Sequence, residues 1–188
     1  MARMARIVIP GIPHHVTQRG NRREQVFFSA DDYRYYLELL AEATEKADTK
    51  VWSYCLMPNH VHLILVPGHE DSLRATFSDA HRRYTQRINR RNEWTGHLWQ
   101  GRFGSVAMDE SHFANAVRYV SLNPVRANLV KQAAEWRWSS VAAHLSGRDD
   151  LLVKVAPVLS RYPDFADWLA IGEDDEMSLK LRKAETIG

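Results

Sequence analysis

The hydrophobic and polar positions along the chain predict four strands and two intervening helices. Alternating or short apolar runs bounded by turn residues are typical of strands, and four such runs cover residues 12–19, 51–57, 60–66 and 104–108. Apolar positions three and four residues apart are typical of helices, and two such segments begin at Ser29 and Ser72. The resulting order, β-α-β-β-α-β, predicts the α+β class, with a ferredoxin-like antiparallel sheet that has these helices on one face.

A third, C-terminal helix is predicted after the last strand, beginning at Ser111, a residue type that often caps helices. Pro124 predicts that this helix ends by Asn123, because proline disfavours helical geometry in the residue before it. Tyr119 and Asn123 are four residues apart, so both lie on one flank of the added helix. A tyrosine beside an apolar stripe commonly only packs, and an asparagine before proline commonly ends a helix. A phenol nucleophile beside an amide ligand is the functional alternative.

The composition is that of a folded domain with a short appendage. The chain has 188 residues, of which 45% are hydrophobic and 26% are charged, as in ordinary globular proteins. No apolar run approaches the roughly 20 residues of a membrane-spanning helix, and residues 1–6 lack the apolar stretch of a signal peptide. The one cysteine, Cys55, cannot form an internal disulfide, so we expect a cytoplasmic protein without a membrane partner.

Charge divides the chain at about residue 148. Residues 1–148 carry 20 basic and 14 acidic side chains, a balance of +6, whereas residues 149–188 carry 5 basic and 9 acidic ones, a balance of −4. Of the 20 basic groups in the first part, 17 are arginines, whose planar guanidinium group fits phosphate oxygens two at a time. We therefore expect a domain over residues 1–148 that favours a nucleic-acid partner, followed by an acidic surface tail over residues 149–188.

The sharpest chemical feature is a pair of histidines in the third predicted strand. Side chains alternate between the two faces of a strand, so His60 and His62 point the same way, roughly 7 Å apart. Two imidazoles on one face can bind a divalent cation, although a half-exposed strand can also carry two surface histidines. Ile64 stands where nucleotide hydrolases with three alternating histidines would have their nucleophile, which argues against that enzyme class. Three other histidines have no partner at ligand spacing and are expected to be non-catalytic: His14, His15 and His144.

Basic and aromatic residues supply candidate contacts to nucleic acid. Arginines follow one flank of the second helix, two more follow the first strand, and the loop before the last strand mixes tryptophan with arginine. Basic groups can simply be solvated on a helix face, but interleaved aromatic rings can stack on unpaired bases. The candidate nucleic-acid-contacting residues are Arg83, Arg87, Arg90, Arg22, Arg23, Arg102 and Trp99.

Three segments together resemble a known protein family. They read Tyr-Cys-Leu-Met-Pro-Asn-His-Val-His at residues 54–62, Leu-Trp-Gln-Gly-Arg-Phe at residues 98–103, and Tyr-Val-Ser-Leu-Asn-Pro-Val-Arg-Ala at residues 119–127. In content and order they resemble the REP-associated tyrosine transposases, a branch of the single-tyrosine HUH transposases. The resemblance covers roughly residues 5–146, and the three motifs together are far more specific than an isolated His-x-His.

The resemblance implies a metal-dependent transposase that cleaves and rejoins single-stranded DNA at hairpin-forming repeats through a 5′-phosphotyrosine intermediate. It implies that Tyr119 is the nucleophile and that His60, His62 and Asn123 hold Mg²⁺ or Mn²⁺. Transposases of mobile elements in the wider group often have glutamine as the third ligand, and asparagine is the form found in the REP-associated branch. The implied partner is single-stranded or hairpin DNA with REP-like palindromes, bound by a bacterial, nucleoid-associated protein that tends to be a monomer.

Two other functions are compatible with these residues. A domesticated protein could bind the hairpins with little transposition activity, although the intact set of His60, His62, Tyr119 and Asn123 argues against a loss of chemistry. An RNA-binding module also fits the mixture of basic and aromatic residues, and preferential binding of RNA hairpins would support it. Cleavage of hairpin DNA in the presence of Mn²⁺ separates the enzyme from the binding protein.

Overall fold

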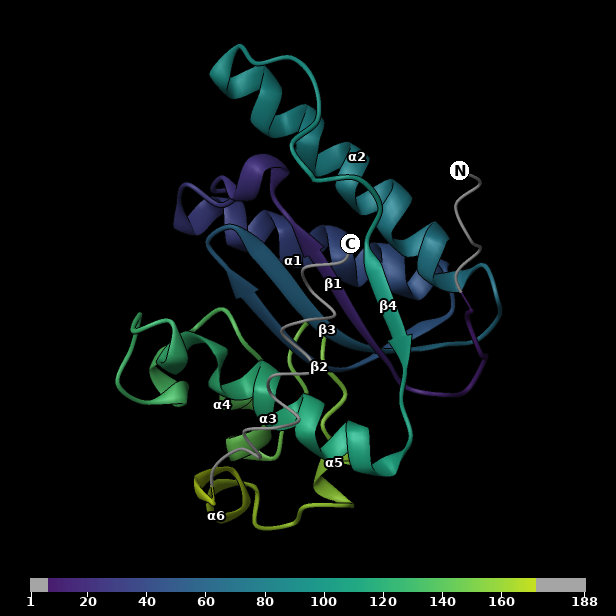
Figure 1. Ribbon diagram of the computed structural model, residues 1–188, viewed down its shortest axis with the longest axis vertical. Coiled ribbons are helices and arrows are strands. Elements are labelled where there is room, and N and C mark those ends of the chain that lie inside the picture. Colours follow the sequence, from purple (N-terminus) through teal and green to yellow (C-terminus); the bar gives the residue numbers. More distant parts are fainter. Residues whose placement is uncertain (1–6, 172–188) are drawn as a thin grey trace.

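Four antiparallel strands form the central sheet of the computed structural model, which describes residues 7–171 (Figure 1). The strand order is β2-β3-β1-β4, and each neighbouring pair is antiparallel. This is a ferredoxin-like order, with the first and third strands at the centre, so the predicted fold class is confirmed. The strands are β1 (His14–Arg19), β2 (Thr49–Met57), β3 (His60–Pro67) and β4 (Gly104–Ala107).

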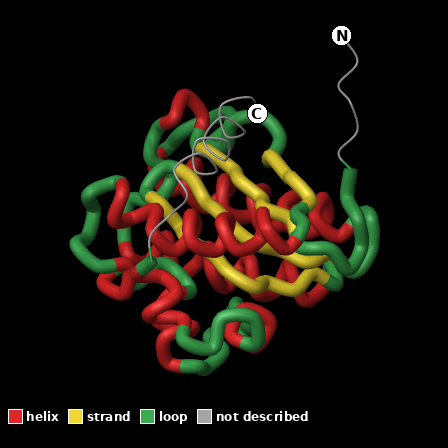
Figure 2. The backbone as a smooth tube through the Cα atoms, turned by 60° about the horizontal axis from the view of Figure 1, so that its bottom comes forward, coloured by secondary structure: helices red, strands yellow, loops and turns green. Residues whose placement is uncertain are grey.

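Helices cover both faces of this sheet (Figures 1 and 2). α1 (Ala30–Lys46) and α2 (Ser72–Asn92) pack together on one face, whereas α3 (Glu110–Arg126) lies on the other face against β2 and β3. Strand residues alternate between these layers, so that Leu63 packs with α1 and α2 while its neighbour Ile64 packs with α3. The added helix therefore closes the face that the two intervening helices leave open.

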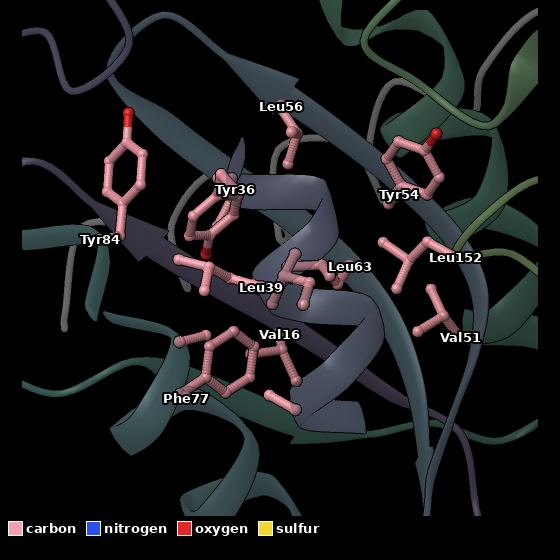
Figure 3. Packing of buried hydrophobic residues seen from close by; sticks show 14 of the residues in the cluster. Val16, Tyr36, Leu39, Val51, Tyr54, Leu56, Leu63, Phe77, Tyr84 and Leu152 are labelled. Atoms are coloured by element: carbon pink, nitrogen blue, oxygen red, sulfur yellow. The ribbon is translucent and has the colours of Figure 1, made fainter. Parts of the chain in front are cut away.

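The larger core lies between the sheet and the helices α1 and α2. Tyr36 and Leu39 from α1 and Phe77 from α2 meet Val16 and Leu63 from the strands (Figure 3). Each of these side chains is at most 2% exposed. Burial of a large apolar side chain contributes about 1.5–3 kcal/mol to the stability of the fold. This layer therefore holds the sheet in place, and the other face of the sheet carries the polar residues of the site.

The predicted starts of the helices are correct for α1 and wrong for α3. Ser29 caps α1 through a reciprocal pair of hydrogen bonds with Asp32. The cap of α3 is Asp109 and not Ser111, because the Asp109 carboxylate accepts from the backbone N–H of His112 at 2.8 Å. Within residues 7–171, no helix is long and apolar enough to cross a membrane.

The added helix continues beyond its predicted end. Pro124 lies inside α3, which ends at Arg126, so the prediction of an end by Asn123 is wrong. Proline has no N–H and therefore removes one helical hydrogen bond, but two other donors form hydrogen bonds in the last turn of α3. The Ala127 N–H donates to the Asn123 carbonyl at 3.0 Å, and the Arg126 guanidinium donates to the Tyr119 carbonyl at 3.0 Å. Tyr119 and Asn123 therefore lie on one continuous helix.

The chain after α3 folds back onto the domain as far as residue 171. Leu152 and Val153 join the core on the side of α1, and Val158 and Phe165 join the core beneath α3. The prediction of an acidic surface tail thus does not describe residues 149–171. The apolar residues of this segment are scattered among charged ones without a helical or strand period, so the sequence pattern does not indicate that they are buried. Residues 172–188 lie outside the described part. The short elements are η1 (Asn21–Arg23), η2 (Ala133–Glu135), α4 (Val141–Ser146), α5 (Ala156–Leu159) and α6 (Phe165–Ala170).

Candidate active site

One face of the sheet carries a group of polar side chains beneath α3. Residues directly opposite one another on neighbouring strands point to the same face. His60 is opposite Arg19 on β1, and His62 is opposite Thr17. The two histidines therefore share a face, as predicted, and Ile64 on the same face packs against α3. The sheet register thus gathers two imidazoles, a guanidinium and a hydroxyl under one helix.

The two predicted ligand histidines lie close together. Their ring centroids are 4.8 Å apart, with the ring planes nearly perpendicular at 86°. His60 Nδ1 lies 2.6 Å from the Asn59 carboxamide oxygen. Burial lowers the pKa of His60 to about 3, with a smaller contribution from the cationic Arg19, and burial also lowers the pKa of His62 well below its usual value. Both rings are therefore neutral at physiological pH, which is the form that binds metal ions.

A third histidine, His15, adjoins this pair. Its Nε2 lies 3.2 Å from His62 Nδ1, and the two rings are stacked with centroids 5.4 Å apart and planes 15° apart. Burial lowers the pKa of His15 to about 4. The expectation that His15 has no partner is wrong, because the partner comes from β3 and not from a neighbouring sequence position. Strand alternation puts His15, Thr17 and Arg19 on one face of β1, but only the pairing with β3 places that face on the side of His62.

The other two histidines are held by backbone carbonyls. His14 Nδ1 lies 2.8 Å from the Ile12 carbonyl oxygen, and His144 Nδ1 lies 2.8 Å from the Ser140 carbonyl oxygen. His14 precedes His15 on β1, so its side chain points to the opposite face of the sheet. Both contacts fit the structural role expected for these residues.

Tyr119 approaches the same polar face from α3. Its ring centroid lies 5.5 Å from that of His62, at an interplanar angle of 82°, and 6.1 Å from that of His15, at 72°. The Arg126 guanidinium carbon lies 3.8 Å from the centre of the Tyr119 ring, which is a cation–π contact. Tyr119 is only 3% exposed. The structure therefore brings the predicted nucleophile to a predicted ligand, and it adds Arg126, which lies two helical turns after Tyr119 and was not identified from the sequence.

Asn123 follows Tyr119 by one turn of α3 and is buried. Side chains four residues apart share a helix face, so Asn123 lies on the flank that carries Tyr119. In the part of the chain described, no group of three His, Cys, Asp or Glu side chains is placed to hold a metal ion. A cation bound by His60 and His62 would therefore take oxygen from an amide, water or phosphate as its further ligands. Two neutral imidazoles and an amide oxygen form a donor set that suits a divalent ion such as Mn²⁺.

The predicted DNA-contacting arginines of α2 line a groove across the sheet from the histidines. Arg83 already pairs with Glu42 at 2.6 Å, whereas the Arg87 guanidinium lies 4.4 Å from the ring centre of Tyr35. Among residues 7–171, neither Arg87 nor Arg90 has a carboxylate partner. The groove has a volume of about 710 Å³ and is lined by Tyr35, Arg83, Gln86, Arg87, Arg90 and Arg91.

The remaining predicted contact residues lie at the end of β1 and in the loop before β4. Arg22 and Arg23 are exposed and both have left-handed backbone angles, with φ of 55° and 63°. Arg102 lines a pocket of about 770 Å³ beside α2, together with Trp99. Trp99 is only 7% exposed and stacks on His81 with ring centroids 4.5 Å apart. The ring of Trp99 is therefore mostly covered, whereas Arg22, Arg23 and Arg102 are open to solvent. Their contacts with DNA stay predictions.

The chain matches a family model and two curated relatives. The model described as "Transposase IS200 like" matches residues 9–123, which is more than half of the chain. The REP-associated tyrosine transposase of Escherichia coli strain K12 is 21% identical over 121 residues, which cover 64% of this chain and 70% of that protein. The putative REP-associated tyrosine transposase of Haemophilus influenzae is 26% identical over 97 residues, which cover 46% of this chain and 55% of that protein.

A solved structure shares the fold. It is a REP-associated tyrosine transposase bound to a REP hairpin, and it matches with a TM-score of 0.67 at 22% identity, over 80% of this chain and 90% of that one. These matches confirm the resemblance to the REP-associated tyrosine transposases that the three sequence motifs indicate. With the family model spanning β1 to the last turn of α3, the chain belongs to the family of IS200-like transposases.

Proposed function

We propose that this transposase cleaves and rejoins single-stranded DNA at hairpin-forming repeats, with Tyr119 as its nucleophile. The observation that carries the proposal is the approach of Tyr119 to His62, with ring centroids 5.5 Å apart on one buried face. The relative of known structure is bound to a REP hairpin, which supports hairpin DNA as the partner of this chain. The proposal takes a monomer as the active unit.

The tyrosine would perform the covalent step. The Tyr119 oxygen attacks the scissile phosphorus, a phosphorus–oxygen bond forms to the tyrosine, and the bond to the 3′ oxygen breaks. The phenol loses its proton and the departing oxygen gains one, which leaves a 5′-phosphotyrosine and a 3′-hydroxyl. Attack by the 3′-hydroxyl of another strand reverses the step and rejoins DNA without ATP, because the phosphodiester bond energy is conserved.

His60, His62 and Asn123 would hold the divalent cation, Mg²⁺ or Mn²⁺. When bound, such an ion polarises the phosphate and offsets its developing negative charge. The chain supplies its own cations at the same place, because Arg19 lies opposite His60 in the sheet and Arg126 covers the ring of Tyr119. Guanidinium groups bind phosphate oxygens in pairs, so we expect both arginines to orient the backbone of the DNA strand being cut.

The combined substitution His60→Ala and His62→Ala tests the ligand assignment. Calorimetric titration should show that Mn²⁺ affinity falls by more than about 100-fold, since loss of even an outer partner costs about 10–100-fold. Cleavage of labelled hairpin DNA should fall to background, while hairpin affinity measured in EDTA should survive. His14→Ala is the matched control, because His14 is also buried but bonds to the Ile12 carbonyl. Retention of cleavage by the double variant would contradict the proposal.

Arg87→Ala is expected to weaken the binding of every DNA hairpin by a similar factor. A phosphate contact positions DNA without reading its sequence, and Arg87 presents its charge in the groove of α2. The slope of log affinity against log salt concentration should fall by about 0.9, as measured by titrating fluorescent hairpins at several salt concentrations. Arg83→Ala should change this slope less, because Glu42 already pairs with Arg83. An altered preference among hairpin sequences would instead assign Arg87 to base recognition.

A further inference from the structure

We propose that His15 is a positioning residue that fixes the ring nitrogen through which His62 binds a divalent cation. The proposal rests on the proposed function, because it takes His62 to be a metal ligand. His15 is opposite Ile64 in the sheet and reaches His62 diagonally, as neighbouring strands allow. It is 5% exposed, and its ring lies between a ligand on β3 and the nucleophile on α3.

The contact between the two rings constrains their protons. His15 Nε2 and His62 Nδ1 are 3.2 Å apart, which is within the range of an N–H hydrogen bond. A hydrogen bond between two ring nitrogens needs a proton on one nitrogen and a lone pair on the other. One of the two nitrogens must therefore donate and the other must accept, so only two arrangements are possible.

The two arrangements have opposite consequences for metal binding. If His15 donates, His62 accepts at Nδ1 and carries its proton on Nε2, which then has no lone pair to offer a cation. If His62 donates from Nδ1, its Nε2 carries the lone pair, and His15 holds its own proton on Nδ1. Metal-binding histidines typically donate from the second ring nitrogen to a neighbouring acceptor, which fixes both tautomer and ring orientation. The second arrangement is therefore the one that serves the site.

His60 provides an independent observation of the same kind. Its Nδ1 lies 2.6 Å from the Asn59 carboxamide oxygen, and that oxygen can only accept a hydrogen bond. His60 therefore carries its proton on Nδ1 and presents Nε2. With His15 as the acceptor for His62, both histidines of β3 present Nε2 to a cation between them. The two acceptors come from different elements, the β2–β3 turn and β1.

Nitrogen-15 NMR of the imidazole rings in the metal-free protein tests the tautomer directly. We expect His62 to carry its proton on Nδ1 in the unmodified protein. His15→Phe keeps a flat ring but has no nitrogen, so His62 should lose this single tautomer. His15→Gln has a carboxamide oxygen that can accept from Nδ1, so it should restore the tautomer. A proton on Nε2 of His62 in the unmodified protein would overturn the proposal.

Calorimetric titration with Mn²⁺ alone gives the second readout. The dissociation constant should rise about 10–100-fold in His15→Phe, and His15→Gln should recover most of the affinity. Hairpin affinity in EDTA should be equal in all variants. His14→Phe is the matched control, because His14 is the adjacent buried histidine on the opposite face of the sheet, and it should leave Mn²⁺ affinity unchanged.

Three results would overturn the inference and are distinguishable. Equal losses of Mn²⁺ affinity in His14→Phe and His15→Phe would reduce the role of His15 to packing. Unchanged affinity in His15→Phe would remove His15 from the site while leaving the proposed function intact. Failure of the unmodified protein to bind Mn²⁺ would overturn the metal site and the role of His15 together. If His15→Phe does not fold, His15→Leu and His15→Gln, which differ in their ability to accept a hydrogen bond, decide the question in the same assays.

Discussion

Cleavage of single-stranded DNA is expected to fall to background in Tyr119→Phe, and no covalent protein–DNA adduct is expected to form. Removal of a covalent nucleophile typically costs a factor of roughly 10⁴ or more in rate. The substitution removes one oxygen and keeps the ring that packs against His62 and under Arg126. Thermal stability, Mn²⁺ affinity and hairpin affinity should therefore barely change. Denaturing gels of end-labelled hairpin DNA measure both the cut strand and the adduct.

Two other buried tyrosines provide matched controls for this experiment. Tyr84 donates to the Val26 carbonyl at 2.7 Å, and Tyr54 donates to the Asp150 carboxylate at 2.7 Å. Tyr84→Phe and Tyr54→Phe each lose one hydrogen bond, worth about 1 kcal/mol of stability, but should cut DNA and form the adduct normally. Cleavage that persists in Tyr119→Phe would point to attack by water. Cleavage by all three variants would end the assignment of a tyrosine nucleophile.

Truncation after Gly147 is expected to prevent folding, which circular dichroism and thermal unfolding would measure. The deletion removes side chains that are at most 9% exposed from both cores. Their burial contributes about 1.5–3 kcal/mol each, which together is comparable with the whole stability of a typical domain, about 5–15 kcal/mol. The side chains lost are those of Leu152, Val153, Val155, Val158, Phe165 and Leu169.

Truncation after Ile171 is the control for this deletion. It keeps all of the buried side chains just named and removes residues 172–188, which carry 3 basic and 5 acidic groups, a balance of −2. The shortened protein should fold, and its affinity for DNA should stay the same or rise slightly at low salt, because charges act over only about 8–10 Å at moderate salt. A chain that ends at Gly147 and still folds would show that the C-terminal segment is dispensable for the core.

The sheet and the three long helices were predictable from sequence because burial imposes a period on each of them. In β3, Val61, Leu63 and Leu65 enter the core on one face, which leaves His60 and His62 on the other. That alternation is a local property, so the shared face of the two histidines followed directly from their spacing. The ferredoxin-like antiparallel sheet followed from the order of the elements along the chain.

The contacts between distant segments were not predictable in the same way. His15 meets His62 only because β1 pairs with β3 in one particular register, and no local pattern specifies that register. The helix α3 continues past Pro124 because hydrogen bonds from Ala127 and Arg126 close its last turn. Local helix propensity predicts an end before Pro124, so the contacts made in the folded protein decide where α3 ends. The burial of residues 152–169 depends likewise on the surfaces that they cover.

Two sets of polar contacts join α3 to the C-terminal segment. Arg161 pairs with Glu110 through two hydrogen bonds, at 2.8 and 2.9 Å. Farther along the helix, the Arg118 guanidinium lies 4.3 Å from the ring centre of Trp168 and donates to the Trp168 carbonyl. These contacts involve none of the residues proposed to bind DNA or a cation.

The attachment of α3 to the C-terminal segment affects how the activity of such an enzyme can change during evolution. Tyr119 and Asn123 both lie on α3, while His60 and His62 lie on β3, so under the proposed function the position of this one helix sets the alignment of nucleophile and ligands. Misplacement of reacting groups by about 1 Å can cost about 100-fold in rate. Under the proposed function, substitutions at Arg161 or Trp168 can therefore lower or raise the cleavage rate during evolution. The residues of the three sequence motifs need not change.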